Sequence, residues 1–504
     1  MKKDTWWIVG TLLAGVLLAP AYQYKLNPDG MSYLMLARAL SKGDFVHGTS
    51  LYWSPLFSWS LVPLLWMNVP ELLALKVVQA VFAAGFVATS FALLRRFASP
   101  CVVRVVMQSV LVILGLYYGF IFSSPDLLLL ACICGFLALG LHPDFASRKH
   151  LAIYAGLFAG IAVLAKHVAF PLFFLVIPAF CTLWICRSPR ERCALLRQWM
   201  ITTFFFLLPS LSWIAVMSAH AGRLTLGGAG PLIHASEGPG HPGLPILNQG
   251  LFAPPTPQGL SVWDDPSNLH IPPWSPFDSS ANFFHQLKLL IVHSGELFAA
   301  IQSFTPFALC ILVWAVLRIT MPREPRERWL LLAMLCTATL LALLYLPILI
   351  DERYFWLHAV LLLLMGGMLC AEALQYRLFQ RKNTWVLLVA LFLSFTVRPL
   401  WYLLLEFRHG DRFAMTMYTY AATYNLDRTR IAADDWKTGL FATYYAGGQY
   451  YGKPKPGTDA MLEEQLLAMD IDAYLVWGRE PSFQHFTFSS GTQSPKVFLR
   501  AVNH

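Results

Sequence analysis

Charged residues are scarce in this chain. Only 13% of its 504 residues are Asp, Glu, Lys or Arg, whereas 57% are hydrophobic. A soluble domain carries about 25% charged residues, so this composition excludes a chain made only of soluble domains. Repeated apolar runs, each near the roughly 20 residues that a helix needs to cross a bilayer, indicate a polytopic membrane protein instead.

The sequence also lacks a disulfide framework, because its nine Cys residues lie in the apolar runs or at their ends. Cys132 and Cys134 would face different sides of one helix, and His234, His241 and His270 follow no metal-site spacing, so no metal site is predicted there. The C-terminal tail has no Gly-rich phosphate loop and no catalytic-triad motif. No internal repeat is visible, which counts against transporters built from repeated halves.

Hydropathy predicts about eleven transmembrane helices. After the first of them comes an outer segment, 25–70, in which the aromatic run 55–67 is too short to span and is expected along the interface. A second outer loop covers 219–295. The helices are expected at roughly 5–24, 71–94, 101–120, 124–141, 151–165, 168–186, 198–218, 296–317, 329–349, 355–374 and 384–404.

The membrane topology follows from the placement of Lys and Arg. Basic residues gather in the loops on one side of the predicted helices, as at Arg95, Arg148 and Arg326, and this side is predicted to be cytoplasmic. The N-terminus is then cytoplasmic, and an odd number of spans puts the C-terminal tail outside. The net charge of +9 is a feature of the inner face. A nucleic-acid partner is not expected, since it would need a clustered basic face on a soluble domain.

The second outer loop contains a long irregular segment, 222–276, that is rich in Gly and Pro. Such a segment is either a disordered linker or a lid that gates a substrate. The sequence favours a flexible lid, because Phe252, Trp263, Trp274 and Phe277 could dock on the membrane-facing surface.

The tail combines a helical pattern at 459–469 with a buried strand pattern at 471–477, which predicts a small α/β domain. The expected fold is therefore an all-α polytopic membrane domain, 1–404, followed by a small extracytoplasmic α/β domain, 405–504.

Titratable side chains stand at the outer ends of several spans, where charge is costly unless it is used or solvated. Asp29 in an Asn-Pro-Asp-Gly turn and Asp126 in a Ser-Pro-Asp helix start also suit plain capping roles. Lys166, followed by His167, could instead reach the lipid headgroups, and Arg353 could pair with the acids beside it. Together, however, the acids and cations come from different hydrophobic segments and are expected on one face. Acids suit a base or a sugar-hydroxyl acceptor, and cations suit a phosphate leaving group.

Several short motifs resemble those of the GT-C glycosyltransferases, polytopic enzymes that use polyprenyl-phosphate-linked sugars. Within them the motifs resemble the bacterial branch related to protein O-mannosyltransferases, the lipid A aminoarabinose transferase and RgtA/B/C/D-like transferases, which implies a location in the plasma (inner) membrane. The resemblance covers essentially the whole membrane part. It rests, in chain order, on Asn-Pro-Asp-Gly-Met-Ser-Tyr, Tyr-Trp-Ser-Pro-Leu-Phe, Ser-Pro-Asp, Ala-Lys-His-Val-Ala-Phe-Pro and Glu-Arg-Tyr.

This resemblance implies roles for the outer residues. Asp29 would be the catalytic base toward the acceptor, and Asp126 would position the acceptor or the sugar. Lys166 and Arg353, with His167 beside them, would contact the lipid phosphate. Relatives often carry a second acid where this chain has glycine after Asp29, so a divalent metal at Asp29 stays open and is not assigned.

The sequence therefore predicts a membrane glycosyltransferase that moves a sugar from a polyprenyl-phosphate donor to an acceptor hydroxyl at the outer face, with inversion as the family's usual outcome. Its partners would be the lipid-linked donor, membrane lipids, and an acceptor that is a glycan, lipid A, another lipid or a protein. The alternative is a multi-span transporter or flippase of lipid-linked sugars without transferase chemistry. The sugar, the polyprenol length and the oligomeric state stay open.

Overall fold

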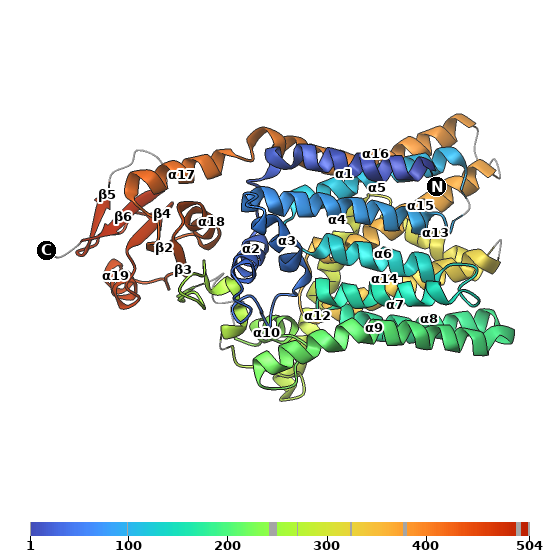
Figure 1. The fold of residues 1–504 in the computed structure, drawn as a ribbon, viewed down its shortest axis with the longest axis horizontal. Helices are drawn as coiled ribbons and strands as arrows, with labels where there is room; N and C mark the ends of the chain where they lie inside the picture. Colours follow the sequence, from blue (N-terminus) through green and yellow to red (C-terminus); the bar gives the residue numbers. More distant parts are fainter. Residues whose placement is uncertain are drawn as a thin grey trace.

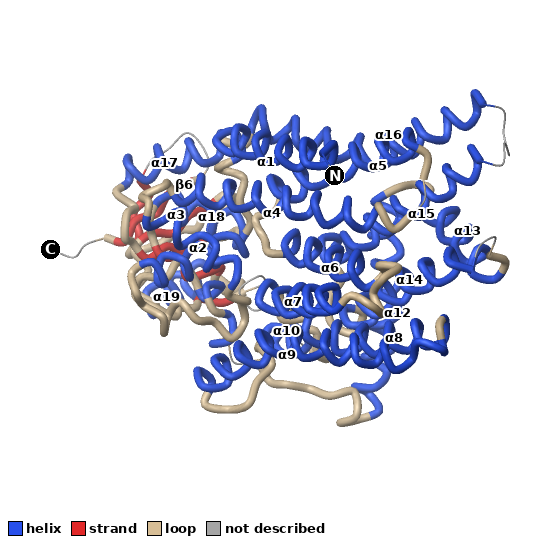
Figure 2. The backbone as a smooth tube through the Cα atoms, turned by 45° about the vertical axis from the view of Figure 1, so that its right-hand side comes forward, coloured by secondary structure: helices blue, strands red, loops and turns tan. Residues whose placement is uncertain are grey.

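A computed structural model of the chain describes residues 2–97, 99–240, 249–269, 271–322, 325–375, 381–489 and 495–501. Long helices run side by side to form a bundle, and a small α/β unit stands at one end of it (Figure 1). The N-terminus lies toward the opposite end of the bundle. Figure 2 shows that the strands are confined to the small unit.

The bundle follows from the apolar runs of the sequence. Eight described helices are long and apolar enough to cross a membrane, or nine if the bent pair α12 and α13 is one span. Prolines precede α4, α5 and α6 directly, as expected for a residue that begins a helix but cannot continue one. The bundle helices are α1 (Lys2–Tyr22), α4 (Glu71–Leu94), α5 (Cys101–Ile121), α6 (Asp126–Gly140), α7 (Lys149–Ala165), α8 (Ala169–Arg187), α9 (Arg192–Ala221), α12 (Ser280–Phe304), α13 (Ala308–Thr320), α14 (Pro325–Tyr345), α15 (Trp356–Gln375) and α16 (Arg381–His409).

Two of the predicted spans are short helices. α6 and α7 are apolar but have only 15 and 17 residues. They pack together between α4 and α9. The count of about eleven spans therefore stays a prediction.

The prediction of one straight helix at 296–317 is wrong. α12 ends at Phe304 and α13 begins at Ala308, and the two meet at a bend of 97°. Thr305 between them has φ −160° and ψ 136°. It precedes Pro306, and a residue before proline is driven out of the helical region into extended backbone. The proline therefore predicts the bend, whereas a hydropathy profile does not detect it.

The first outer segment forms two helices, α2 (Pro28–Ser41) and α3 (Leu56–Trp66). Asn27 caps α2 by accepting a hydrogen bond from the Gly30 N–H at 3.2 Å, and Pro28 takes the first helical position. α3 falls within the aromatic run 55–67, which the sequence predicts to be too short to span. Most of α2 is buried, so this helix is part of the protein core and is not a surface helix.

The second outer loop is more ordered than its composition predicts. It holds α10 (Ala229–Ser236), β1 (Gly250–Leu251) and the single turns η2 (Val262–Asp264) and η3 (Pro266–Asn268). It also ends earlier than predicted, because α12 begins at Ser280, where the Ser279 side chain caps it. Residues 241–248, which include His241, lie outside the described residues, and so does His270.

The C-terminal unit is the expected α/β structure. Its six-stranded sheet has the order β1-β3-β2-β4-β6-β5, with β2 parallel to both β3 and β4 and the other pairs antiparallel. Its edge strand β1 comes from the second outer loop, which the sequence did not predict. The elements of the tail are α17 (Arg412–Tyr424), β2 (Arg430–Ala433), α18 (Trp436–Ala446), β3 (Gln449–Lys453), α19 (Asp459–Ala468), β4 (Ala473–Val476), β5 (Phe486–Ser489) and β6 (Lys496–Arg500).

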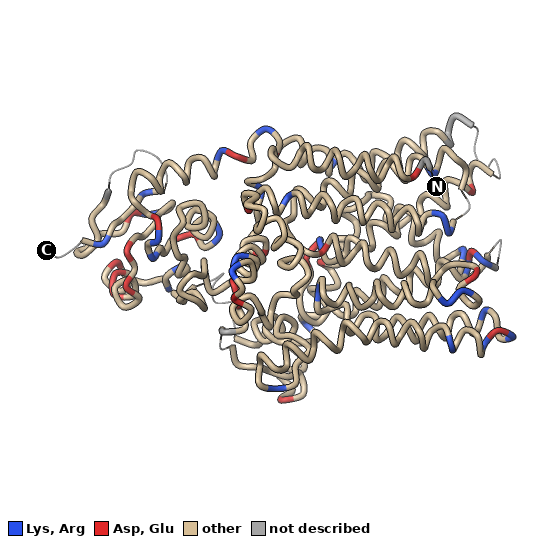
Figure 3. The backbone as a smooth tube through the Cα atoms, viewed as in Figure 1, with Lys and Arg blue, Asp and Glu red and all other residues tan. Residues whose placement is uncertain are grey.

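Charge is distributed as a membrane protein requires. Lys, Arg, Asp and Glu lie mainly at the ends of the bundle and in the C-terminal unit, and the middle of the helices holds few of them (Figure 3). A group of both signs lies at the bundle end that faces the C-terminal unit.

Candidate functional site

Four of the predicted site residues meet at one place. Asp29 lies in the first turn of α2 and Asp126 is the first residue of α6, while Lys166 follows the last turn of α7. Arg353 comes from η4 (Glu352–Phe355), a short turn before α15. Each residue thus stands at a helix end, and the helix packing brings the four ends together.

Two ion pairs connect the four side chains. Arg353 Nη1 donates to Asp29 Oδ2 at 2.5 Å, and Lys166 Nζ donates to Asp126 Oδ1 at 2.5 Å. Arg353 Nε also lies 3.1 Å from Asp351 Oδ2 and 3.9 Å from Asp126 Oδ2, so this guanidinium joins the two pairs. The side chains of Asp126, Asp29 and Arg353 are only 4%, 13% and 14% exposed. Water therefore screens these charges weakly.

Two tyrosines hold the lysine. Lys166 Nζ lies 3.7 Å from the centre of the Tyr354 ring, which stacks on Tyr345 at 4.5 Å and 14°. Burial lowers the pKa of Lys166, but the carboxylate of Asp126 and the two phenols raise it more, so the net shift is upward. Lys166 is therefore a permanent cation here, held by a cation–π contact as well as by an ion pair.

Trp263 completes the surroundings of Asp29, and sequence reasoning did not assign it to the site. Its indole N–H donates to Asp29 Oδ1 at 3.4 Å. Its carbonyl accepts from Ser32 Oγ at 2.8 Å and from Trp53 Nε1 at 3.1 Å. The expected docking of this residue on the membrane-facing surface is wrong, since Trp263 is 9% exposed inside the site. Phe277, from the same prediction, is 87% exposed.

Two polar residues inside α4 support the chain that leads to Asp126. The ammonium of Lys76 donates to the Phe120 carbonyl at 2.9 Å and to Ser123 Oγ at 3.0 Å. Gln79 Nε2 donates to the Ser124 carbonyl at 2.9 Å. Sequence reasoning missed both, although a lysine and a glutamine three positions apart in an apolar helix were a usable signal.

Gly30 lets α2 approach this chain closely. A Cβ atom at position 30 would lie 2.6 Å from Ser123 Cβ and 2.9 Å from the Ser123 carbonyl oxygen. Any larger residue therefore forces the backbone apart. The missing second acid after Asp29 has a steric reason in this chain.

His167 lies apart from the ion pairs. Its Nε2 accepts a hydrogen bond from Trp213 Nε1 at 3.3 Å, and its ring packs against Gly227. Burial lowers its pKa to about 4, so the ring is neutral. Among the described contacts none joins this ring to Asp29, Asp126 or Arg353. Its surroundings favour a role in fixing the chain next to Lys166.

Comparison with known proteins places this site in a known fold. No family model matches the sequence, and no curated protein matches it. Among solved structures, ArnT from Cupriavidus metallidurans bound to undecaprenyl phosphate superposes with a TM-score of 0.55 at 13% identity, over 98% of each chain. The fold is that of ArnT. The archaeal oligosaccharyltransferase AglB from Archaeoglobus fulgidus, in complex with an inhibitory peptide and a dolichol-phosphate, gives a TM-score of 0.49 at 11% identity, over 94% of this chain and 69% of that one.

ArnT is the lipid A aminoarabinose transferase, one of the GT-C enzymes that the sequence motifs resemble. The likeness to ArnT extends over the C-terminal unit as well as the bundle, since the match covers 98% of this chain. The resemblance inferred from the motifs is therefore confirmed at the level of the fold.

The residues of this cluster do not suit a metal ion. Within the described residues, no three His, Cys, Asp or Glu side chains gather as a metal site would require. Asp29 presents one oxygen to Arg353 and the other to the indole N–H of Trp263. Asp126 likewise faces Lys166 and Arg353. A dication would have to displace these donors and stand beside two cations, so no step of the reaction is assigned to a metal.

Proposed function

We propose that this protein is a membrane glycosyltransferase that transfers a sugar from a polyprenyl-phosphate donor to an acceptor hydroxyl. The observation that carries the proposal is the convergence of Asp29, Asp126, Lys166 and Arg353 at one end of the bundle. In this buried cluster, a carboxylate can accept the proton of an attacking hydroxyl. The two permanent cations can stabilise the phosphate that leaves the sugar. The ArnT fold agrees with this chemistry, because ArnT was solved with undecaprenyl phosphate bound.

The cations bind the donor phosphate. Lys166 and Arg353 each use a charged donor group on a carboxylate in the described arrangement. A phosphodiester entering from the bilayer competes for the same donors, and charge-assisted hydrogen bonds to phosphate are strong where water is excluded. Binding the donor therefore loosens Asp29 from Arg353, and the freed carboxylate becomes available as a base.

The acceptor hydroxyl then attacks the anomeric carbon in a single displacement. The new bond forms between the acceptor oxygen and the anomeric carbon, and the bond from that carbon to the phosphate oxygen breaks. Asp29 takes the hydroxyl proton, and the electron pair of the broken bond leaves on the polyprenyl phosphate, stabilised by Lys166 and Arg353. Asp126 keeps Lys166 in place and orients the sugar or acceptor. Inversion at the anomeric carbon is the outcome of one such step.

The reaction would take place at the outer face of the plasma (inner) membrane. In this topology the N-terminus is cytoplasmic and the C-terminal unit extracytoplasmic, which agrees with the location of the N-terminus toward the opposite end of the bundle (Figure 1). The membrane domain 1–404 would carry the chemistry. The domain 405–504 would cover the site from outside, together with the second outer loop.

A direct assay tests this function. The full chain in lipid nanodiscs is incubated with radiolabelled undecaprenyl-phosphate sugars, and release of the sugar to water or to a surface glycan is followed. Cleavage of the donor by the protein supports the proposal. If proteoliposomes instead move the intact lipid-linked sugar across the bilayer without cleaving it, the protein is a transporter or flippase and the proposal is wrong.

A further inference from the structure

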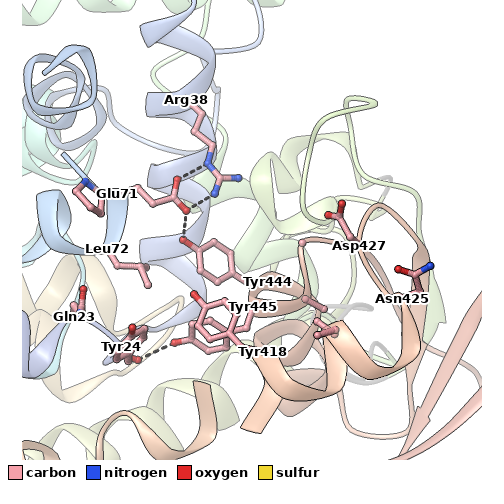
Figure 4. Close-up of a pocket in the computed structure, with 15 residues that line it drawn as sticks. Gln23, Tyr24, Arg38, Glu71, Leu72, Tyr418, Asn425, Asp427, Tyr444 and Tyr445 are labelled. Carbon is pink, nitrogen blue, oxygen red and sulfur yellow. Dashed lines mark hydrogen bonds and ion pairs between the residues drawn. The ribbon is translucent and has the colours of Figure 1, made fainter. Parts of the chain in front are cut away.

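A cavity lies where the first outer segment meets the C-terminal unit (Figure 4). Its volume is about 610 Å³, within the range of about 300–1,000 Å³ typical of small-molecule sites. The lining comes from α2, the start of α4, α17 and α18. None of the described residues that line it belongs to the cluster of Asp29, Asp126, Lys166 and Arg353.

Tyrosine dominates one wall of this cavity. Tyr24, Tyr418 and Tyr445 form a connected set of rings, with Tyr418 lying 5.5 Å from Tyr445 and 6.4 Å from Tyr24. The hydroxyl of Tyr445 donates to the Tyr24 carbonyl at 2.9 Å, which holds the set in place (Figure 4). Aromatic faces are electron-rich and attract the weakly positive C–H groups on the face of a sugar ring.

The charged side chains of the lining leave little capacity to bind an anion. Arg38 forms a two-pronged ion pair with Glu71, and the hydroxyl of Tyr444 donates to the same carboxylate at 2.6 Å. The charge of Arg38 is therefore already neutralised. The other carboxylate among the described lining residues, Asp427, is 71% exposed and lies 3.7 Å from the guanidinium of Arg428, which is outside the lining. The described lining therefore presents no unpaired cation to a phosphate, sulfate or carboxylate ligand, whereas it offers donors and acceptors to a neutral ligand with many hydroxyls.

Amide groups supply the remaining hydrogen-bonding capacity. Gln23 and Asn425 both line the cavity, and each can donate and accept. A lining that combines tyrosine rings with amide and carboxylate oxygens suits a sugar, because the faces of a sugar ring are apolar and its rim is polar.

We propose that this cavity binds a neutral saccharide. We assign this saccharide to the part of a glycan acceptor that does not react. This part of the assignment rests on the proposed transferase function. α2 connects the two places, since Asp29 stands at its start and Arg38 lies about 13 Å further along at 1.5 Å per residue. A glycan held by the tyrosines would thus be anchored at one end of α2 while its reacting hydroxyl lies at the other.

The test measures saccharide binding directly, without the transfer reaction. The full chain is placed in lipid nanodiscs free of maltoside detergent, whose headgroup is itself a saccharide. Isothermal titration calorimetry then measures the affinity for cellobiose, lactose, mannobiose and maltotriose, with glucose 6-phosphate as an anionic probe. We expect at least one neutral saccharide to bind, and to bind more tightly than the phosphate.

Variants on α17 give matched controls. Tyr418→Ala removes a wall of the cavity and should weaken binding about 5–10-fold, whereas Tyr418→Phe keeps the ring and should bind as the wild type does. Tyr420→Ala, on the same helix but outside the lining, should leave the affinity unchanged. Asn425→Gly deletes an amide without backbone strain, because Asn425 has φ 55°, and should weaken binding about twofold to tenfold.

Two results would overturn the assignment. One is the absence of binding for every neutral saccharide, and the other is equal affinity in the wild type, Tyr418→Ala and Asn425→Gly. Failure of the transferase function looks different, because it would show as intact donor in the cleavage assay while saccharide binding persisted. If the donor is cleaved but no saccharide binds, the acceptor is not held here as a glycan.

Discussion

Arg353 Nη1 lies 2.5 Å from Asp29 Oδ2, although the two residues are 324 positions apart in the sequence. The pair connects the first turn of α2 to the turn before α15. Arg353 also faces Asp126 and Asp351, so one guanidinium is shared among three carboxylates. In the proposed reaction this shared cation exchanges a carboxylate for the donor phosphate, and the predictions on catalysis follow from this proposal.

Replacing Asp29 by Asn should lower the rate of sugar transfer about 10²–10⁴-fold, the usual contribution of a general base. The reason is that Asn cannot take the proton of the acceptor hydroxyl. Initial rates with labelled donor in nanodiscs measure this. The matched control is Asp351→Asn, which also removes a carboxylate 3.1 Å from Arg353 but one that is 41% exposed; its rate should stay within about fivefold of the wild type. Wild-type turnover by D29N would remove Asp29 from the role of base.

Replacing Lys166 by Met should weaken donor binding more than it slows the chemical step. Met fills similar space beside the Tyr354 ring but cannot donate to a phosphate, and losing a charged hydrogen bond corresponds to about 10–100-fold in affinity. Binding of undecaprenyl phosphate by titration is the measurement. Lys288→Met, an exposed lysine on α12, serves as control. Unaltered affinity in K166M would contradict the phosphate assignment.

Replacing Trp263 by Phe should lower turnover about 2–10-fold with little change in donor affinity. The substitution keeps an aromatic ring beside Trp53 but deletes the indole N–H that faces Asp29 at 3.4 Å. Trp274→Phe is the matched control, because Trp274 comes from the same loop and donates instead to the His234 carbonyl at 2.7 Å. Equal losses in both variants would mean that the loop matters only as a whole.

Replacing Gly30 by Ala should destabilise the folded protein by about 1–3 kcal/mol, the usual range for overpacking. The added methyl group would lie 2.6 Å from Ser123 Cβ, next to a backbone that Lys76 already holds. Chemical unfolding of the purified chain measures the change. Gly85→Ala in α4 should be neutral or slightly stabilising, since nothing lies within 4 Å of its new methyl group. Unchanged stability in G30A would show that α2 can move away freely.

Asp264 should make stability depend on pH. Burial, opposed by hydrogen bonds from the backbone of Leu260 and Ser261, raises its pKa from 3.8 to about 7. The folded state therefore holds the proton more tightly than the unfolded chain does. This contribution to stability is fully present below pH 3.8 and is lost as the pH rises to about 7.

Unfolding measured across that pH window tests the prediction. Asp264→Asn should flatten the dependence on pH, since an amide does not titrate. Asp278→Asn is the control, because it changes an exposed carboxylate of the same loop, and it should keep the wild-type profile. A pH profile identical in the wild type and D264N would show that Asp264 does not govern this region.

Much of this protein could be predicted from local sequence alone. Apolar runs predicted the bundle, because the need to satisfy backbone hydrogen bonds in lipid leaves a helix as the solution for each run. The helix starts at Asp29 and Asp126 were readable from their prolines, and the strand Ala473–Val476 from its continuous apolar residues. The motifs around the four charged residues were enough to indicate the fold that ArnT shares. Their roles, like the number of spans, stay predictions.

Tertiary structure alone decided the rest. Hydropathy does not show that Trp263 contacts Asp29, or that Gly250–Leu251 joins the sheet of the tail. It also does not show that the neighbouring residues His167 and Lys166 have different partners, Trp213 and Asp126. Composition predicted a loose loop, because Gly and Pro mark irregular backbone but say nothing of what that backbone contacts. Helix formation depends on neighbours in the chain, whereas an ion pair or an edge strand depends on which distant segments packing brings within hydrogen-bonding reach.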